Sequence, residues 1–226
     1  DLAVRLQLVD IEGDTITTDK SSLGGGIYPT SQWRLGETVR QLPTLVIPAD
    51  AENGVHTITA ALLADDVVLA EEPLGELVIE GRPRLLEQPP VEAEVRATFG
   101  DIVSLVGAQG LGGASLESGI VTFDLVWQVV GAPVADLVRF AQLIDEDGRL
   151  IAQQDTIPCE TACPAPSWLV GEYLIDNVSM HLPETIEGDG FQILVGWYGV
   201  DDQQRLSAVD DAGASLPDNV VTLPRD

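Results

Sequence analysis

Four aromatic side chains have the type and placement that suit carbohydrate binding. Trp33 and Trp168 occupy matching places in two similar stretches, and Tyr173 and Tyr198 lie beside or within alternating stretches. A flat aromatic face packs well on the C–H face of a pyranose ring, so these four are candidate stacking residues. Alternatively, the two tryptophans plug the ends of a folded core, because large aromatics carry much of core burial. Repetition of the whole surrounding stretch favours that alternative.

Repeated acidic residues raise the question of catalysis. Glu37 and Glu172 recur at equivalent positions. A glycosidase needs two carboxyl groups about 5–9 Å apart across one bond, and a chain with 37 acidic residues supplies such pairs by accident. A repeated acid is better explained as a cap on backbone N–H groups or as the partner of an arginine. We therefore assign no catalytic residue and predict that the chain is not an enzyme.

Acidic residues in predicted turns raise the question of calcium, whose ligands are oxygens at close spacing. The candidate ligands are Asp10, Glu12, Asp14, Asp145 and Asp147. The pattern does not meet that of an EF-hand, which ends on a bidentate glutamate. The ordinary preference of Asp for turns accounts for these residues without a metal. We expect no cofactor, with Ca²⁺ left open as the alternative.

The two cysteines, Cys159 and Cys163, are predicted to form one local disulfide. Zinc needs two further ligands, and His56 and His181 are the only histidines. A thioredoxin-type site needs Cys-x-x-Cys at the start of a helix, which is not the spacing here. If the chain is exported, an even number of cysteines is best explained by a disulfide.

Charge and composition exclude several partners. The 226 residues include 11 basic and 37 acidic side chains, for a net charge of −26, so neither nucleic acid nor an anionic membrane surface is an expected partner. Hydrophobic residues make up 45%, enough for a folded core. No apolar run reaches the roughly 20 residues that span a bilayer, so we expect no direct membrane insertion by this segment. Because the chain starts at Asp1 without a methionine, we expect a mature or excised segment.

The elements that position these residues are predicted to be β-strands. Apolar residues alternate with a period of two over residues 2–9, 121–130 and 191–198. Clusters that contain glycine and acidic or amide residues, such as 52–54 and 146–148, separate the strands and suit tight hairpins. The sequence shows no convincing amphipathic helix of three turns. This pattern predicts an all-β chain of antiparallel β-sandwich domains, Ig-like or jelly-roll-like.

An internal repeat organises the chain. Residues Pro29–Glu37 match Pro164–Glu172 at an offset of 135 residues (168 − 33 for the tryptophans), and Leu8–Asp10 match Leu143–Asp145 at the same offset. The spacing of later glycines suggests one inserted residue in the second copy. One position fits less well, because an apolar residue of the first strand falls on Arg139.

The repeat predicts two tandem domains. The first, residues 1–83, lacks leading strands that the second, residues 91–226, carries around 97–106 and 120–130. The stretch 84–90 is rich in proline and polar residues and is the predicted linker. A shortened sandwich leaves an unpaired edge or an uncovered core. We expect upstream residues, the second domain or a partner to cover it.

The repeated motifs resemble a known module. They are Leu143–Gly148, Pro164–Glu172, Leu182–Pro183 and Phe191–Tyr198 in the second copy, and Leu8–Gly13, Pro29–Glu37, Ile47–Pro48 and Val55–Leu62 in the first. The pattern is similar to the C-terminal extracytoplasmic β-sandwich modules of bacterial multi-pass membrane glycosyltransferases of the protein-mannosyltransferase-like kind. The sequence departs from it at Pro166, at the two cysteines, and at Val55 and Phe191, where tyrosine is usual.

The resemblance implies a location outside the cytoplasmic membrane and an accessory role, because the transferase chemistry of such proteins belongs to their membrane part. We therefore expect a non-enzymatic structural module of a membrane-anchored or surface-attached protein. Its expected partner is another cell-surface protein or the upstream part of the same polypeptide. The alternative function is carbohydrate binding through exposed aromatics, with glycans as partners.

Overall fold

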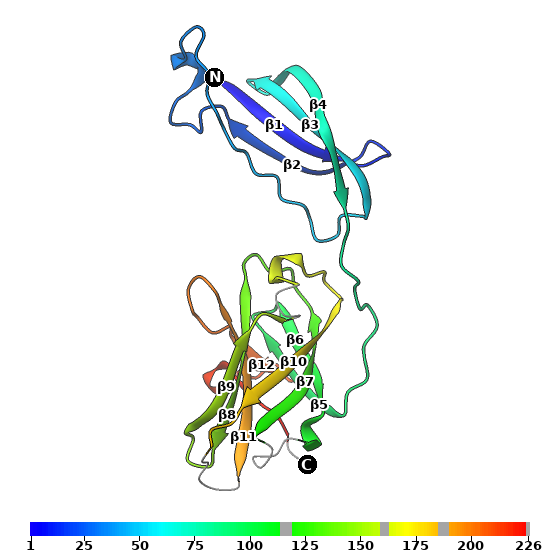
Figure 1. Cartoon of the computed structure of the whole chain (residues 1–226), viewed down its shortest axis with the longest axis vertical. Coiled ribbons are helices and arrows are strands. Elements are labelled where there is room, and N and C mark those ends of the chain that lie inside the picture. Colours follow the sequence, from blue (N-terminus) through cyan, green and yellow to red (C-terminus); the bar gives the residue numbers. More distant parts are fainter. Residues whose placement is uncertain (114–118, 159–162, 185–189, 225–226) are drawn as a thin grey trace. The chain divides into compact units, whose positions relative to one another are not determined.

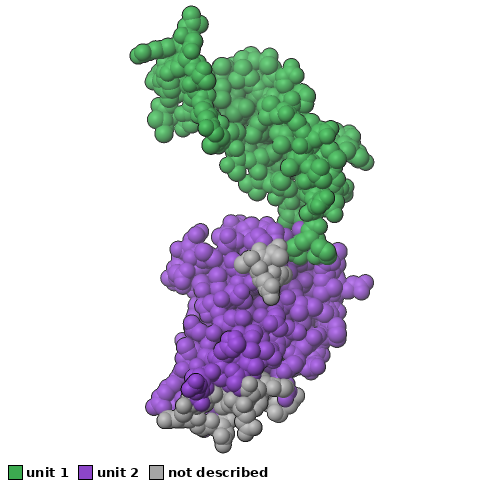
Figure 2. All heavy atoms as spheres, viewed as in Figure 1, with its two compact units in different colours: residues 1–83 green, residues 84–226 purple. Residues whose placement is uncertain are grey.

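The computed structural model describes residues 1–113, 119–158, 163–184 and 190–224. The chain divides into two compact units, Asp1–Pro83 and Arg84–Asp226 (Figure 2). Antiparallel strands dominate both units (Figure 1), which confirms the predicted all-β fold. No helix within the described residues is long and apolar enough to cross a membrane.

Unit 1 contains one four-stranded sheet in the order β2-β1-β3-β4. Its elements are β1 (Leu2–Val9), β2 (Thr15–Ser22), the short 3-10 turn η1 (Thr30–Gln32), β3 (Gly54–Ala64) and β4 (Val67–Ile79). The residues between η1 and β3 run alongside the sheet without joining it as a strand (Figure 1). Unit 1 thus has a single layer of strands.

Unit 2 is a sandwich of two antiparallel sheets. The five-stranded sheet has the order β10-β7-β6-β5-β12, and the four-stranded sheet has the order β13-β11-β8-β9. The elements are β5 (Ala93–Phe99), β6 (Val103–Gln109), η2 (Leu111–Gly113), β7 (Ile120–Val129), β8 (Leu137–Asp145), β9 (Leu150–Thr156), η5 (Ala165–Ser167), β10 (Tyr173–His181), β11 (Phe191–Gly199), β12 (Ala208–Asp210), η6 (Pro217–Asn219) and β13 (Val221–Thr222). Apolar residues of both sheets form one buried core. Trp127 of one sheet meets Trp197 of the other edge to face, with ring centroids 5.0 Å apart.

The four-stranded sheets of the two units share one plan. The order β2-β1-β3 in unit 1 corresponds to β9-β8-β11 in unit 2. Leu8 lies opposite Ile58, and Leu143 lies opposite Ile193, so the offset of 135 (143 − 8 and 193 − 58) holds through the third strand. The insertion expected from glycine spacing is therefore wrong in this strand, because hydrogen-bond register sets which residues are equivalent.

A buried ion pair joins the two sheets of unit 2 at the residue that broke the apolar pattern. Arg139 of β8 is 0% exposed, and its Nε and Nη2 donate to the two carboxylate oxygens of Asp176 on β10 at 2.7 and 3.1 Å. The side-chain and main-chain oxygens of Gln154 accept from two further guanidinium N–H groups at 3.1 and 3.0 Å. The Trp127 indole N–H adds a 3.3 Å hydrogen bond to Asp176. A buried charge requires hydrogen-bond partners of this kind, because it loses its hydration when it is buried.

Breaking this ion pair on one side should destabilise unit 2. The variant Arg139→Leu leaves the Asp176 carboxylate buried without its partner, and we expect a loss of about 3–5 kcal/mol. Urea unfolding followed by tryptophan fluorescence measures it. The double variant Arg139→Leu with Asp176→Leu should recover most of the loss. Arg149→Leu removes an exposed pair with Asp147 in the same unit and should change stability by less than about 1 kcal/mol. Equal losses for Arg139→Leu and Arg149→Leu would contradict this account.

Candidate functional site

The repeated stretch from proline to glutamate builds the same corner in each unit. We call Pro29–Glu37 and Pro164–Glu172 the corner segments. In each, a 3-10 turn follows the proline and ends at the tryptophan. The indole N–H of Trp33 donates to the carbonyl oxygen of Tyr28 at 2.9 Å, and the equivalent bond in unit 2 measures 2.8 Å. The indole nitrogens are therefore used to hold the corner.

The repeated glutamates cap main-chain amides, as expected. Glu37 Oε2 accepts from the Arg34 amide at 3.0 Å, and Glu172 Oε2 accepts from the Leu169 amide at 3.3 Å. The glycine before each glutamate has a φ of +82° or +94°, a left-handed conformation that favours glycine. The sequence motif thus encodes a turn geometry that both units repeat.

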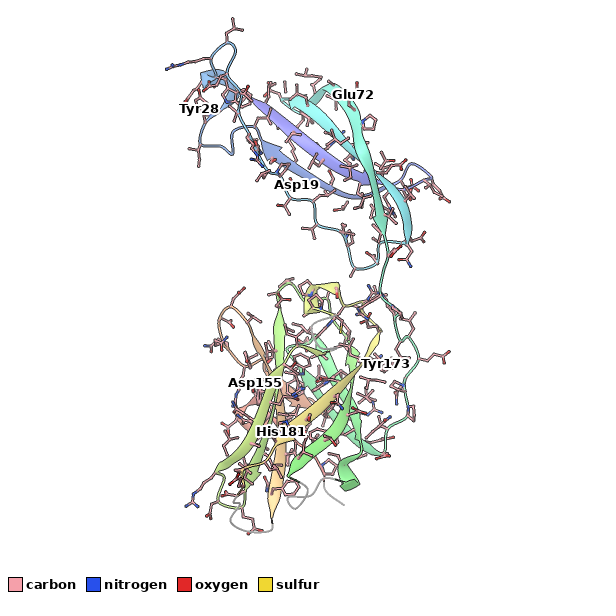
Figure 3. All side chains as sticks on the ribbon, in the orientation of Figure 1. Asp19, Tyr28, Glu72, Asp155, Tyr173 and His181 are labelled. Carbon is pink, nitrogen blue, oxygen red and sulfur yellow. The ribbon has the colours of Figure 1, made fainter. Side chains whose placement is uncertain are left out.

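The second partner of each glutamate differs between the units. Glu172 is 0% exposed and pairs with Arg84. Glu37 is exposed and accepts a 2.7 Å hydrogen bond from the hydroxyl of Tyr28, which Figure 3 labels in unit 1. The Arg34 amide, followed by the Tyr28 hydroxyl, lowers the pKa of Glu37, and the hydrogen bond to Glu37 raises the pKa of Tyr28. The expectation that a repeated acid meets an arginine thus holds in unit 2.

The predicted linker packs on unit 2. It begins with Arg84, which makes the ion pair just described, and the Leu85 carbonyl accepts from the Tyr173 amide at 2.7 Å. At its other end, the side chain of Gln109 donates to the carbonyl of Pro90. The stretch is therefore tied to unit 2 at both of its ends.

The candidate stacking aromatics lie in different environments. Trp168 is 2% exposed and packs edge to face on Trp197, with centroids 5.6 Å apart. Its stacking role is therefore wrong, because core residues cover the ring. Trp33 in unit 1 is half-buried, as are Tyr173 and Tyr198 in unit 2.

Tyr198 has the most developed polar and aromatic surroundings of the candidates. Its ring stacks on Phe140 with centroids 6.2 Å apart, and the Arg205 guanidinium carbon lies 4.7 Å from the Phe140 ring centroid. The Tyr198 hydroxyl donates to Asp155 at 3.1 Å. Burial, followed by this hydrogen bond, raises the pKa of Tyr198. We call these four residues the Tyr198 array; Figure 3 labels Asp155.

Sequence reasoning found only one member of this array. Phe140 belongs to β8 but lies out of phase with the core residues Ala141 and Leu143, so it projects from the opposite face of the sheet. This position of Phe140, out of step with the core residues of β8, was the sequence signal that could have identified it. Arg205 also lines a largely apolar hollow of about 480 Å³ beside Leu137.

The acidic turns use their carboxylates internally. Asp10 Oδ1 accepts from the amides two and four residues later at 2.9 and 2.8 Å, and Asp145 Oδ1 accepts from the Arg149 amide at 2.7 Å. Asp210 forms the same turn a third time, while Asp147 pairs with the Arg149 side chain at 3.4 Å. Within the described parts of the chain, no three His, Cys, Asp or Glu side chains gather as metal ligands. The turn explanation thus accounts for Asp10 and Asp145.

Comparison with known proteins adds no assignment: no protein-family model and no curated protein matches the sequence. The corner segments use their indole and carboxylate groups in internal hydrogen bonds, whereas the Tyr198 array combines a half-buried ring with a carboxylate and a guanidinium.

The corner of unit 1 should loosen in acid. The folded-state pKa of Glu37 lies below the ordinary 4.5, so its hydrogen bonds stabilise the corner above that pH, and their contribution is lost as pH falls through the lowered pKa. The NMR signal of the Trp33 indole N–H, followed from neutral to acid pH, measures the change. The variant Glu37→Gln keeps an acceptor oxygen but cannot titrate, and should remove the transition. Identical titrations in the two proteins would refute the assignment.

Proposed function

We propose that the chain is a non-enzymatic accessory module that lies outside the cytoplasm and spaces, docks or assembles a larger surface-attached or membrane-anchored protein. The observation that supports this most directly is the double use of the signature. Trp33 and Glu37 make the same hydrogen bonds to the backbone as Trp168 and Glu172. Residues that recur because they hold a fold are poor candidates for chemistry.

The proposed location rests on the resemblance of the corner and hairpin motifs to extracytoplasmic modules. The net charge of −26 gives the surface a strong self-repulsion, which favours solubility and opposes binding to nucleic acid or anionic lipid. A protein partner, or another part of the same polypeptide, agrees best with this charge.

Export should oxidise the two cysteines. Cys159 lies outside the described residues, so its pairing with the buried Cys163 stays a prediction. Titration of the unfolded, exported chain with a thiol reagent should detect no thiol, and the reduced chain should give two. The short loop limits the stabilisation to about 1–2 kcal/mol, measured as the difference in unfolding free energy between the oxidised and reduced forms. Two free thiols after export would contradict the proposed setting.

The Tyr198 array favours a second candidate function, carbohydrate binding. A half-exposed aromatic ring can stack on a sugar, and the neighbouring Asp155 and Arg205 supply an acceptor and donors for hydroxyl groups. This array differs from the corner segment of unit 2, whose Trp168 and Glu172 are buried, because Arg205 and Asp155 lie at the surface.

Affinity electrophoresis in gels that contain polysaccharide separates the two candidates. The structural proposal expects the mobility of the full chain to stay the same in every gel. If a polysaccharide slows the chain, Tyr198→Ala should abolish the retardation, whereas Tyr173→Ala, a matched tyrosine of the same unit, should keep it. That pair of results would replace the structural proposal with sugar binding at the array.

A further inference from the structure

One face of the unit 1 sheet is more open than its counterpart in unit 2. We call it the inner face; it carries the even-numbered residues of β1 and β3. Ile58, Ala60 and Leu62 on this face are half-buried. The three residues of β11 at the same offset of 135 are 0% exposed. The same apolar surface is therefore closed in one unit and partly open in the other.

Unit 2 shows what closes this face. Its inner face packs against the five-stranded sheet, and three strands of that sheet, β5, β6 and β7, directly precede β8 in the chain. Because β8 corresponds to β1, the covering strands come just before the first strand of the repeat. Phe123, Leu125 and Trp127 of β7 project into the shared core.

A further strand of the covering sheet has a counterpart in unit 1 that forms no strand. Residues 38–46 follow the corner segment at the offset that matches β10. Val39, Gln41 and Leu45 are half-buried, in the same phase as the buried residues of β10. Gln41 contacts the β2 residue Ser21 at 3.2 Å, so the segment lies over the edge of the sheet.

The backbone of residues 38–46 is unpaired. Within unit 1, which the structure describes completely, no main-chain hydrogen bond joins this segment to a strand. In contrast, β10 pairs with β7 from Tyr173 to His181. The segment also exposes apolar side chains, with Leu42 77% and Val46 73% exposed. It occupies the place of β10 without a β7 beside it.

We propose that unit 1 binds a three-stranded antiparallel meander built like β5–β7, which completes its sandwich. The last strand of the meander pairs with residues 38–46, and its apolar side chains cover the inner face. The meander acts in cis, joined to Leu2 as β7 is joined to β8, because the order β2-β1-β3 of unit 1 matches the order β9-β8-β11 of unit 2. This inference rests on the internal repeat and is independent of the proposed function.

The polar groups of unit 1 permit such a layer. The positions of Arg139 and Asp176 hold Val4 and Gln41 in unit 1 (139 − 4 and 176 − 41 are both 135), so the inner face lacks the ion pair of unit 2, and its buried polar side chain is His56 of β3. A tryptophan equivalent to Trp127 would bring its indole N–H to Gln41. The amide oxygen there accepts one bond, from Gly24 at 3.0 Å, and retains a second lone pair.

The test adds a meander to the full chain and follows amide hydrogen exchange. A copy of Val91–Ala135 placed directly before Asp1 reproduces the connection, because Asp136 corresponds to Asp1 (136 − 1 is 135). In the unextended chain, amides 38–46 should exchange as an open segment while those of β10 are protected. In the extended chain, amides 38–46 should slow by about ten-fold or more.

Matched controls decide whether slowing comes from a completed sandwich. A copy that carries F123D, L125D and W127D keeps the length but loses the apolar face, and should give no slowing. Ile58→Asp should remove the slowing in the extended chain and leave the unextended chain folded, whereas Ile193→Asp, at the equivalent position, should disrupt unit 2.

Three results would overturn the proposal. Amides 38–46 that are already as protected as β10 in the unextended chain would show that the face is closed. Protection that rises with protein concentration would show that a second copy is the occupant. Equal exchange in the extended chain and in its charged control would show that the meander does not bind.

Discussion

A β-sheet with one apolar face needs a second layer against that face, because each buried aliphatic side chain contributes about 1.5–3 kcal/mol relative to the same side chain in water. Unit 2 meets this requirement with its own strands, and both sheets share one core. Unit 1 presents the same face, on which Leu6, Leu8 and His56 are buried, whereas Ile58, Ala60 and Leu62 are half-buried. The units differ in the strands that stand against the sheet, while the sheet itself follows one plan in both.

Local and periodic features of the fold could be predicted from the sequence. Alternation with a period of two identified the strands, and the match around Trp33 and Trp168 identified the repeat. Such features can be predicted because they depend on neighbours in the chain. The 3-10 turn, the glycine with positive φ and the glutamate cap all belong to the nine residues of one corner segment. The structure reproduces them in both copies. Turn preference likewise anticipated the internal hydrogen bonds of Asp10.

Interactions between the two sheets of unit 2 could not be predicted from local sequence patterns. Arg139 and Asp176 each interrupt an apolar strand face, but nothing local shows that the two exceptions meet across the sandwich. The glycine spacing misplaced the third strand by one residue, because cross-strand hydrogen bonds fix the register there. The Tyr198 array could not be predicted for the same reason, because Tyr198, Phe140 and Arg205 come from separate stretches of the sequence that only the folded sheet brings together.

The buried ion pair gives the two units different requirements for their second layer. A buried pair adds little net stability against an apolar replacement, yet a shift of one sheet past the other would strand a charge in the core. The register of unit 2 is thus fixed by Arg139 and Asp176, which belong to β8 and β10. The strands β5–β7 contribute only the Trp127 indole N–H to this network. With Val4 and Gln41 at the equivalent positions, unit 1 has no such ion pair to fix the register of a second layer.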